Sequence, residues 1–292
     1  MATIQTQKFG IEIECVSITR QRAAQAVQSI VGGEVAHVGG GSYDPWEIRD
    51  ARGRTWRVVA DASLNDYPAH LRAEVVSPIL DYADLDELQR VVRALRAAGA
   101  KATPTCSIHV HVDAAGHTAA TLANLLKLVA SHEKHLIEAL GVQADRRARY
   151  CRDVDEQVLQ RICSRRPRSM AELNRDWYGA PTENPGRLHH SRYHAVNLNA
   201  VWALGTLEFR LFNGSLHAGK IKSYIQLSLA LSARALRIRH ARGERRTYDA
   251  STTRYDVRVF LLGLGLIGPE FATARYHLLS HLSGSAAFRR AA

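Results

Sequence analysis

Three segments of this 292-residue sequence combine an apolar face with a face of adjacent ionisable side chains. The segments are FGIEIEC (9–15), SIHVHVD (107–113) and TLEFRLF (206–212). Side chains alternate between the two faces of a β-strand. The ionisable residues that share a face are Glu12 and Glu14; His109, His111 and Asp113; and Glu208 and Arg210. Glu74 adds a carboxylate within the apolar segment AEVVSPIL.

Two interpretations of these faces are open. In an antiparallel sheet with one solvated face, polar residues alternate outward, and for any one strand this interpretation suffices. A solvated face usually mixes Thr, Lys, Ser and Gln, whereas these strands together carry Glu, His, Asp and Arg. Two histidines alone suggest zinc, but several carboxylates with one histidine suit Mg²⁺ or Mn²⁺, which share their ligands with substrate phosphates. Arg210 would then be placed for a phosphate oxygen.

Hydrophobic spacing and turn residues predict the elements that must position these strands. Strands are expected at 8–16, 46–50, 55–61, 73–80, 105–113, 193–201 and 206–214, and helices at 84–98, 118–140, 218–240, 255–266 and 271–282. The mixture lacks strict βαβ alternation, which favours an α+β fold with a largely antiparallel sheet flanked by helices. We expect a single domain over residues 1–292, with an Arg-rich excursion at about 142–190 that carries one or two short helices, and a frayed tail at about 284–292.

The composition limits the possible classes of function but does not select one of them. The chain has 39 Lys and Arg against 28 Asp and Glu, a formal net charge of +11. Such a field attracts nucleic acid, anionic lipid, nucleotide phosphates or acidic small molecules. The four cysteines form no CxxC pair, so neither a zinc ribbon nor a redox motif is expected. With no membrane-spanning segment and no signal-peptide pattern, we expect a cytoplasmic location.

Five motifs follow one another along the chain: FGIEIE; D-x-S-L followed by EVVSP; CSIHVHVD; RYHAVNLN; and LEFRLFNG. This series, from about Phe9 to about Leu231, resembles the amidoligase family of the carboxylate–amine ligase superfamily, which includes glutamine synthetase and glutamate–cysteine ligase. The resemblance implies a curved, largely antiparallel sheet that cradles ATP and Mg²⁺ (or Mn²⁺) ions. It also implies that a carboxylate is phosphorylated and that an amine displaces the phosphate to form an amide.

The resemblance further implies roles for individual residues. The expected metal ligands are Glu12, Glu14, Glu74, His109 and Glu208. The residues expected to contact the nucleotide are Glu12, Arg149, Glu208 and Arg210, and those expected in catalysis are Glu74, His111 and Arg210. Asp61 and Ser63 match the D-x-S turn of the family, and Tyr150 lies beside Arg149 in the excursion. Nothing resembles the ammonia-guarding loop of the larger synthetases, so glutamine formation is not implied.

Two other classes stay open at this point. A metal-dependent hydrolase would use the Glu and His residues to activate water, but this chemistry would give Arg210 no obvious role. A basic nucleic-acid-binding protein would use the charge of +11, but aromatic residues make up only 7% of the chain and no nucleic-acid-binding motif is visible. We therefore expect small-molecule or peptide carboxylate and amine substrates, and neither a membrane nor a nucleic acid as partner. Neither substrate nor the oligomeric state follows from the sequence.

Overall fold

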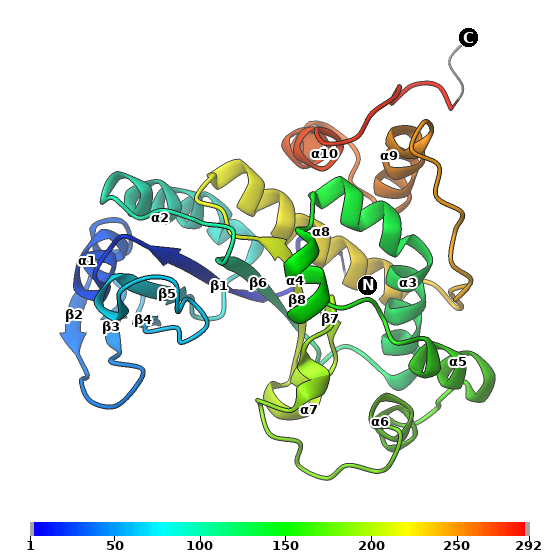
Figure 1. The fold of residues 1–292 in the computed structure, drawn as a ribbon, viewed down its shortest axis with the longest axis horizontal. Coiled ribbons are helices and arrows are strands. Elements are labelled where there is room, and N and C mark those ends of the chain that lie inside the picture. Colours follow the sequence, from blue (N-terminus) through cyan, green and yellow to red (C-terminus); the bar gives the residue numbers. More distant parts are fainter. Residues whose placement is uncertain (1–2, 290–292) are drawn as a thin grey trace. The chain divides into compact units, whose positions relative to one another are not determined.

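The computed structural model describes residues 3–289, and Figure 1 shows its helices and strands. Within these residues eight strands form one sheet in the order β2-β3-β4-β5-β1-β6-β8-β7. The strands are β1 (Phe9–Val16), β2 (Glu34–His37), β3 (Trp46–Arg49), β4 (Thr55–Val59), β5 (Arg72–Val76), β6 (Ser107–Asp113), β7 (Val196–Asn197) and β8 (Thr206–Asn213). The pairs β2–β3, β3–β4, β4–β5, β1–β5 and β7–β8 are antiparallel. Together with the helices, this sheet confirms the predicted α+β class.

The chain divides into two compact units. Unit 1 comprises Met1–Gln7, His111–Leu211 and Gln226–Ala292, and unit 2 comprises Lys8–Val110 and Phe212–Ile225. Strands β6 and β8 and helix α8 (Ala218–Arg237) each contribute residues to both units. The single functional domain expected over residues 1–292 stays a prediction.

In unit 2, one face of the sheet is apolar because alternate residues of its strands are apolar. The register sets Ile48 opposite Trp56 and Val58 opposite Val75. Val75 in turn lies opposite Ile13 of β1. All five side chains are buried. The expected alternation thus places the carboxylates of β1 and β5 on the opposite face.

Two helices complete the core of unit 2. Helix α1 (Arg20–Val31) packs on β2–β5 and against α2 (Leu85–Ala97), as Figure 1 shows. The hydroxyl of Thr19 caps α1 by accepting a hydrogen bond from the backbone of Arg22 at 3.2 Å. Each helix buries an apolar stripe.

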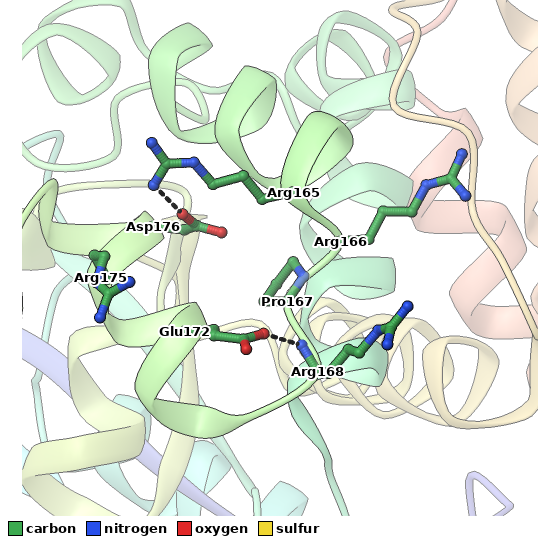
Figure 2. A pocket seen from close by; sticks show the side chains of 7 residues that line it. All are labelled: Arg165, Arg166, Pro167, Arg168, Glu172, Arg175 and Asp176. Carbon is green, nitrogen blue, oxygen red and sulfur yellow. Dashed lines mark hydrogen bonds and ion pairs between the residues drawn. The ribbon is translucent and has the colours of Figure 1, made fainter.

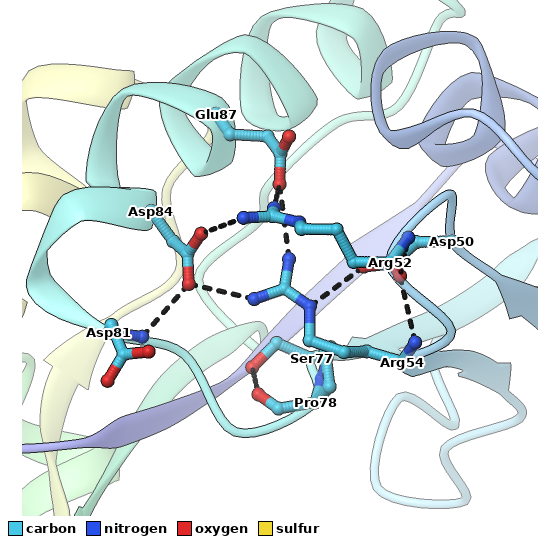
Figure 3. Close-up of polar contacts among 8 residues, drawn as sticks. All are labelled: Asp50, Arg52, Arg54, Ser77, Pro78, Asp81, Asp84 and Glu87. Carbon is cyan, nitrogen blue, oxygen red and sulfur yellow. Dashed lines mark hydrogen bonds and ion pairs between the residues drawn. The ribbon is translucent and has the colours of Figure 1, made fainter.

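Ion pairs tie the turn between β3 and β4 to the start of α2 (Figure 3). Asp50 accepts hydrogen bonds from the backbone N–H groups of Arg52 and Arg54, at 2.9 and 2.8 Å. The guanidinium groups of these arginines donate to Asp84, from Arg52 at 2.6 Å and from Arg54 at 2.8 Å. Burial raises the pKa of Asp84, but hydrogen bonds from the Asp81 backbone and from the two arginines hold it below its ordinary value.

In unit 1, the long helix α3 (Ala119–Leu140) packs against α5, α6, α9 and α10. The remaining α-helices of this unit are α4 (Ala144–Arg149), α5 (Glu156–Arg165), α6 (Met170–Tyr178), α7 (Asn199–Leu204), α9 (Thr253–Gly263) and α10 (Ala272–Leu279). Short 3-10 helices occur at Ala69–Leu71, Tyr82–Asp84, His190–Arg192 and Pro269–Phe271. Among the described helices, none combines the length and the hydrophobicity that crossing a bilayer requires.

The structure differs from the predicted elements in several places. The strand predicted at 193–201 is wrong, because β7 has two residues and α7 follows it. Its end has a local cause: the side-chain oxygen of Asn197 accepts the backbone N–H of Asn199 at 2.8 Å, which turns the chain. Helix α1 and strand β2 were not predicted, and the excursion at 142–190 carries three helices. In the predicted tail, residues 284–289 form neither helix nor strand, and 290–292 lie outside the described residues.

Candidate active site

Four of the ionisable residues on β1, β6 and β8 are buried rather than solvated. Glu14 is 4% exposed, and His109, Glu208 and Arg210 are each 5% exposed. Burying an ionised group costs several kcal/mol unless hydrogen bonds, opposite charges or a cation compensate. A simple solvated face is therefore the wrong interpretation of these four residues.

In unit 2, a chain of hydrogen bonds links Glu14, Ser107, His109 and Glu12. The backbone N–H of Ser107 donates to Glu14 Oε2 at 2.7 Å, and its hydroxyl donates to Oε1 at 2.5 Å. The same hydroxyl lies 3.0 Å from His109 Nε2, and His109 Nδ1 lies 2.9 Å from Glu12 Oε2. Because the only hydroxyl proton points to Glu14, the network assigns a proton to Nε2. Nδ1 then faces a carboxylate, where either a second proton or a metal ion fits.

Two carboxylates face each other across neighbouring strands at the same place. The register of β1 and β5 sets Glu14 directly opposite Glu74. Ligand atoms of Glu14, Asp61 and Glu74 all lie within 4.8 Å of one another, and so do those of Glu12, Glu74 and His109. Like charges directly opposite each other destabilise a sheet, so this cluster favours a cation. Oxygen donors with one imidazole fit the Mg²⁺ or Mn²⁺ that the family resemblance implies.

The D-x-S turn supplies the third carboxylate of this cluster. The backbone N–H of Ser63 donates to Asp61 Oδ1 at 2.7 Å, and the Ser63 hydroxyl donates to Oδ2 at 2.8 Å. This arrangement is an Asx turn, in which the carboxylate bonds to the backbone two residues further on. The two hydrogen bonds hold the Asp61 carboxylate in one orientation.

In unit 1, Glu208 and Arg210 lie on the same face of β8 and form an ion pair, in which Arg210 Nη1 donates to Glu208 Oε1. The other oxygen of Glu208 accepts a hydrogen bond from Asn197 Nδ2 at 2.5 Å. Asn197 is itself 2% exposed and is held by the backbone of Asn199. The carboxylate of Glu208 is therefore fixed from two sides, by a guanidinium group and by an amide.

The backbone around Arg210 is held by residues of the Arg-rich excursion. Arg146 is buried, and its Nη2 donates to the backbone oxygen of Arg210 at 2.9 Å. Arg210 Nε lies 3.4 Å from the backbone oxygen of Tyr150, and its guanidinium carbon lies 5.9 Å from the centre of the Tyr193 ring. Arg149, in contrast, is exposed. Of the arginines in α4, Arg146 contacts β8.

His111 also lies close to this carboxylate in unit 1. Its Nδ1 lies 3.0 Å from the hydroxyl of Thr206, and ligand atoms of His111 and Glu208 lie within 4.8 Å of each other. His111 and Glu208 are therefore neighbours in the structure. The expected roles of His111 in catalysis and of Glu208 as a metal ligand stay predictions.

Two polar residues that the sequence analysis did not single out belong to these networks. They are Ser107 and Tyr178. The Tyr178 hydroxyl donates to Asn199 Oδ1 at 2.6 Å, and burial raises the pKa of this phenol, so it stays a donor. Ser107 stands two residues before His109 on the same strand face, a signal that could have found it. Nothing in the local sequence marks Tyr178, because α6 is far from β7 along the chain.

The cysteines take no part in these networks as nucleophiles. Cys15, in β1, and Cys106, directly before β6, are both fully buried, as cysteines that pack as small hydrophobes usually are. Burial raises the pKa of both thiols, so neither forms the reactive thiolate at neutral pH.

A comparison with protein families agrees with the motif series. The family model described as "Putative amidoligase enzyme" matches residues 5–232. No curated protein matches the chain. The solved structure "GmaS/ADP complex-Conformation 1" aligns with 97% of this chain and 67% of its own, at 15% identity and a TM-score of 0.38. "Apo GmaS without ligand" aligns with 97% of this chain and 66% of its own, at 15% identity and a TM-score of 0.35.

This chain therefore spans about two thirds of the length of the GmaS chains. The family model, in contrast, covers most of the sequence, including all the strands that carry the buried ionisable residues. The protein belongs to the amidoligase family and is, at the level of that family, a carbon–nitrogen ligase that forms amide bonds.

Proposed function

We propose that this amidoligase activates a carboxylic acid as an acyl phosphate and then transfers the acyl group to an amine. The observation that most supports the proposal is the burial of Glu14, His109, Glu208 and Arg210, each at most 5% exposed. Such a set of buried charges is costly for folding alone, and it matches what phosphoryl transfer needs: acidic residues for metal ions and a guanidinium group for a phosphate.

The chemistry has two steps. A carboxylate oxygen attacks the γ-phosphorus of ATP, the bond from the γ-phosphorus to the bridging oxygen breaks, and ADP leaves. The nitrogen of the uncharged amine then attacks the acyl carbon and loses a proton, and inorganic phosphate leaves with one oxygen of the original acid. Phosphorylation is required because an unactivated carboxylate repels nucleophiles and would have to expel oxide.

The metal ions that the family implies would be held by Glu12, Glu14, Glu74, His109 and Glu208. Bound there, they would neutralise the charge of the transferring phosphoryl group. The hydrogen bonds from Ser107 to Glu14 and from Asn197 to Glu208 would hold two of these carboxylates in place. The ligand cluster of Glu14, Asp61 and Glu74 supports this assignment, because carboxylate oxygens that converge within 4.8 Å are the donors that Mg²⁺ and Mn²⁺ prefer.

Arg210 is proposed to bind the γ-phosphate during the first step. Its planar guanidinium group can donate two parallel hydrogen bonds to phosphate oxygens. The ion pair with Glu208 keeps the group charged and oriented while it is buried. Glu74 and His111 are proposed to lie next to the reacting acid, and Arg149, which is exposed on α4, to contact the nucleotide.

An isotope-transfer experiment tests the acyl phosphate directly. The enzyme is incubated with ATP, Mg²⁺, an amine and an acid whose carboxylate carries ¹⁸O, and the inorganic phosphate is analysed by mass spectrometry. One ¹⁸O atom in the phosphate for each amide formed is the expected result. Amide formation with unlabelled phosphate would exclude the intermediate. Metal-dependent hydrolysis without ADP release would instead identify a hydrolase.

A screen of acid and amine mixtures identifies the substrates. Pools of small carboxylic acids and short peptides are combined with pools of amines, and ATP-dependent mass changes are recorded. The proposal requires that ADP release depends on the acid and that amide formation depends on both partners. ADP release that is independent of every acid, in a screen broad enough to include peptide termini, would contradict it.

A further inference from the structure

The arginines of the Arg-rich excursion at 142–190 differ in their burial. Arg165, Arg166 and Arg168 are exposed and line the cavity where α5 ends and α6 begins (Figure 2). Exposed arginines of this kind are hydrated and form an ordinary basic surface. Arg146 of α4 is 4% exposed, and it is the one buried arginine among the described residues of the excursion. Burying a guanidinium group is costly unless it is well hydrogen-bonded, so the contacts of Arg146 indicate what it does.

Arg146 holds strand β8 at Arg210. Its Nη2 donates to the backbone oxygen of Arg210 at 2.9 Å. The backbone N–H of Arg210 donates in turn to the backbone oxygen of Ala195, also at 2.9 Å. The peptide groups on both sides of the Arg210 α-carbon are therefore fixed, one by Arg146 and the other by Ala195. Together they set the direction in which the Arg210 side chain leaves the strand.

The turn that follows Arg146 contacts the Arg210 side chain. The backbone oxygen of Arg146 accepts the N–H groups of Tyr150 and Cys151, at 2.8 and 3.0 Å, and these two hydrogen bonds close the turn. The backbone oxygen of Tyr150 lies 3.4 Å from Arg210 Nε. Arg146 thus contacts β8 through its side chain, and through its backbone it shapes the turn that reaches the Arg210 guanidinium group.

The segment after this turn is joined to β8 by backbone hydrogen bonds. Arg152 forms a parallel bridge with His194. The N–H of Arg152 donates to the oxygen of Tyr193 at 3.0 Å, and its own oxygen accepts the N–H of Ala195 at 2.8 Å. Ala195 is also the residue that accepts from Arg210. A separate surface insertion would lack these bonds, so this part of the excursion supports the strand that carries Arg210.

We propose that Arg146 is a positioning residue for phosphoryl transfer, which holds the Arg210 guanidinium group in the orientation that receives the γ-phosphate. This role rests on the proposed function, in which Arg210 binds that phosphate. It is separate from the nucleotide contact proposed for the exposed Arg149, three residues further along α4. A donor that is already oriented needs no reorganisation when charge develops on the phosphoryl group. Loosening Arg210 should therefore weaken its hold on the γ-phosphate.

The contribution of the γ-phosphate to binding tests this role without turnover. The Kd of ADP and the Kd of the β,γ-imido analogue of ATP are measured by calorimetry with Mg²⁺, in the absence of acid and amine. A charged hydrogen bond to the γ-phosphate should make the wild-type protein bind the analogue about tenfold or more tightly than ADP. Arg146→Lys keeps the buried charge, but its chain is one bond too short for the Arg210 oxygen. This preference should fall about threefold or more, while the Kd of ADP stays at its wild-type value.

Two further variants separate positioning from a structural role. Arg147→Lys is the matched control, because Arg147 is the next residue of α4, is partly exposed and pairs with Asp153, a pair that lysine preserves. It should leave both Kd values unchanged. Arg146→Lys combined with Arg210→Lys should show the preference of Arg210→Lys alone, because no guanidinium fork is left to orient. An additive loss in the double variant, or an unchanged preference in Arg146→Lys, would overturn the proposal.

Hydrogen exchange on the wild-type protein gives a second readout that needs no variant. The imido analogue should slow exchange of the backbone amides in 146–152 more than ADP does, because a phosphate on Arg210 tightens the contacts with that segment. Equal protection by the two nucleotides would overturn the proposal. If Arg210→Lys loses the preference and Arg146→Lys keeps it, only the role of Arg146 fails. If the wild-type protein binds both nucleotides equally, the γ-phosphate contact of Arg210 in the proposed function fails as well.

Discussion

Replacing Glu74 by Gln should stabilise the metal-free protein and abolish its response to metal. Oxygens of Glu74 and Glu14 lie within 4.8 Å of each other. Two unit charges at that separation repel by about 3 kcal/mol at an effective dielectric constant of 20. Because Glu74 is half-buried and solvent screens part of the repulsion, we expect a gain of about 1–2 kcal/mol in the free energy of unfolding.

Thermal unfolding with a chelator, and then with Mn²⁺, measures both effects. For a chain of this size 1 kcal/mol corresponds to about 2–4 °C, so the Tm of Glu74→Gln in chelator should rise by a few degrees. Wild-type protein at 100 times the metal's Kd should gain about 2.7 kcal/mol, and the variant should lose most of this gain. The sign of the change in chelator is the informative result, since most substitutions at a structural residue lower stability.

Glu47→Gln is the matched control for this experiment. Glu47 lies on the same face of the sheet, on β3, and pairs with Arg57 at 3.0 Å where both side chains are partly exposed. Removing an exposed ion pair costs at most about 1 kcal/mol and should leave the response to Mn²⁺ unchanged. If Glu74→Gln is less stable than wild type in chelator and responds normally to metal, Glu74 is a structural residue and the reasoning about repulsion fails.

Three further predictions concern other parts of the structure. Arg210→Lys keeps the charge but loses the planar fork, so ADP formation and amide formation should fall together, about a hundredfold to a thousandfold; ADP formation at the wild-type rate would exclude Arg210 as the γ-phosphate ligand. Asp84→Asn should lower the free energy of unfolding, measured in urea at pH 7, by about 2 kcal/mol. The substitution removes the carboxylate charge and with it the ion pair to the partly exposed Arg54. The pKa of Asp84 is lower in the folded than in the unfolded protein, so this contribution to stability is fully present above the unfolded pKa of about 3.9. It disappears as the pH falls through the folded pKa. Below that pH, the variant and the wild type should have the same stability. Asn197→Ala should reduce kcat about tenfold or more by releasing Glu208, and an unchanged kcat in single-turnover measurements would contradict that role.

The strands that carry the ionisable residues were predictable because alternation is a local property. The boundaries of β1, β6 and β8 follow from apolar residues at every second position, and the same spacing places Glu208 and Arg210 on one face. Helix α1 was missed although its alanines and the capping Thr19 are helix signals. Its apolar stripe is narrow, so tertiary packing on the sheet supplies much of its stability.

The short strand β7 shows where local reasoning stops. The segment 193–201 alternates apolar and polar residues as a strand would, but the side chain of Asn197 competes for the backbone N–H of Asn199 and ends the strand after two residues. The same side chain donates to Glu208 with its other end. One asparagine thus both ends a strand and holds a carboxylate, and sequence periodicity detects neither role.

The register of the sheet decides whether the carboxylates of neighbouring strands point separately into solvent or meet at one site. Alternation predicts that Glu14 and Glu74 leave the apolar core, and a solvated face would satisfy that pattern equally well. Only the pairing of β1 with β5 sets the two carboxylates directly opposite each other, where like charges repel. Ser107, which hydrogen-bonds to Glu14 through both its backbone and its hydroxyl, holds that carboxylate in its buried position instead of letting it turn to solvent. A sheet selected for stability alone would replace one of the pair, so the presence of the buried Glu14 beside the half-buried Glu74 supports the cation that we propose they bind.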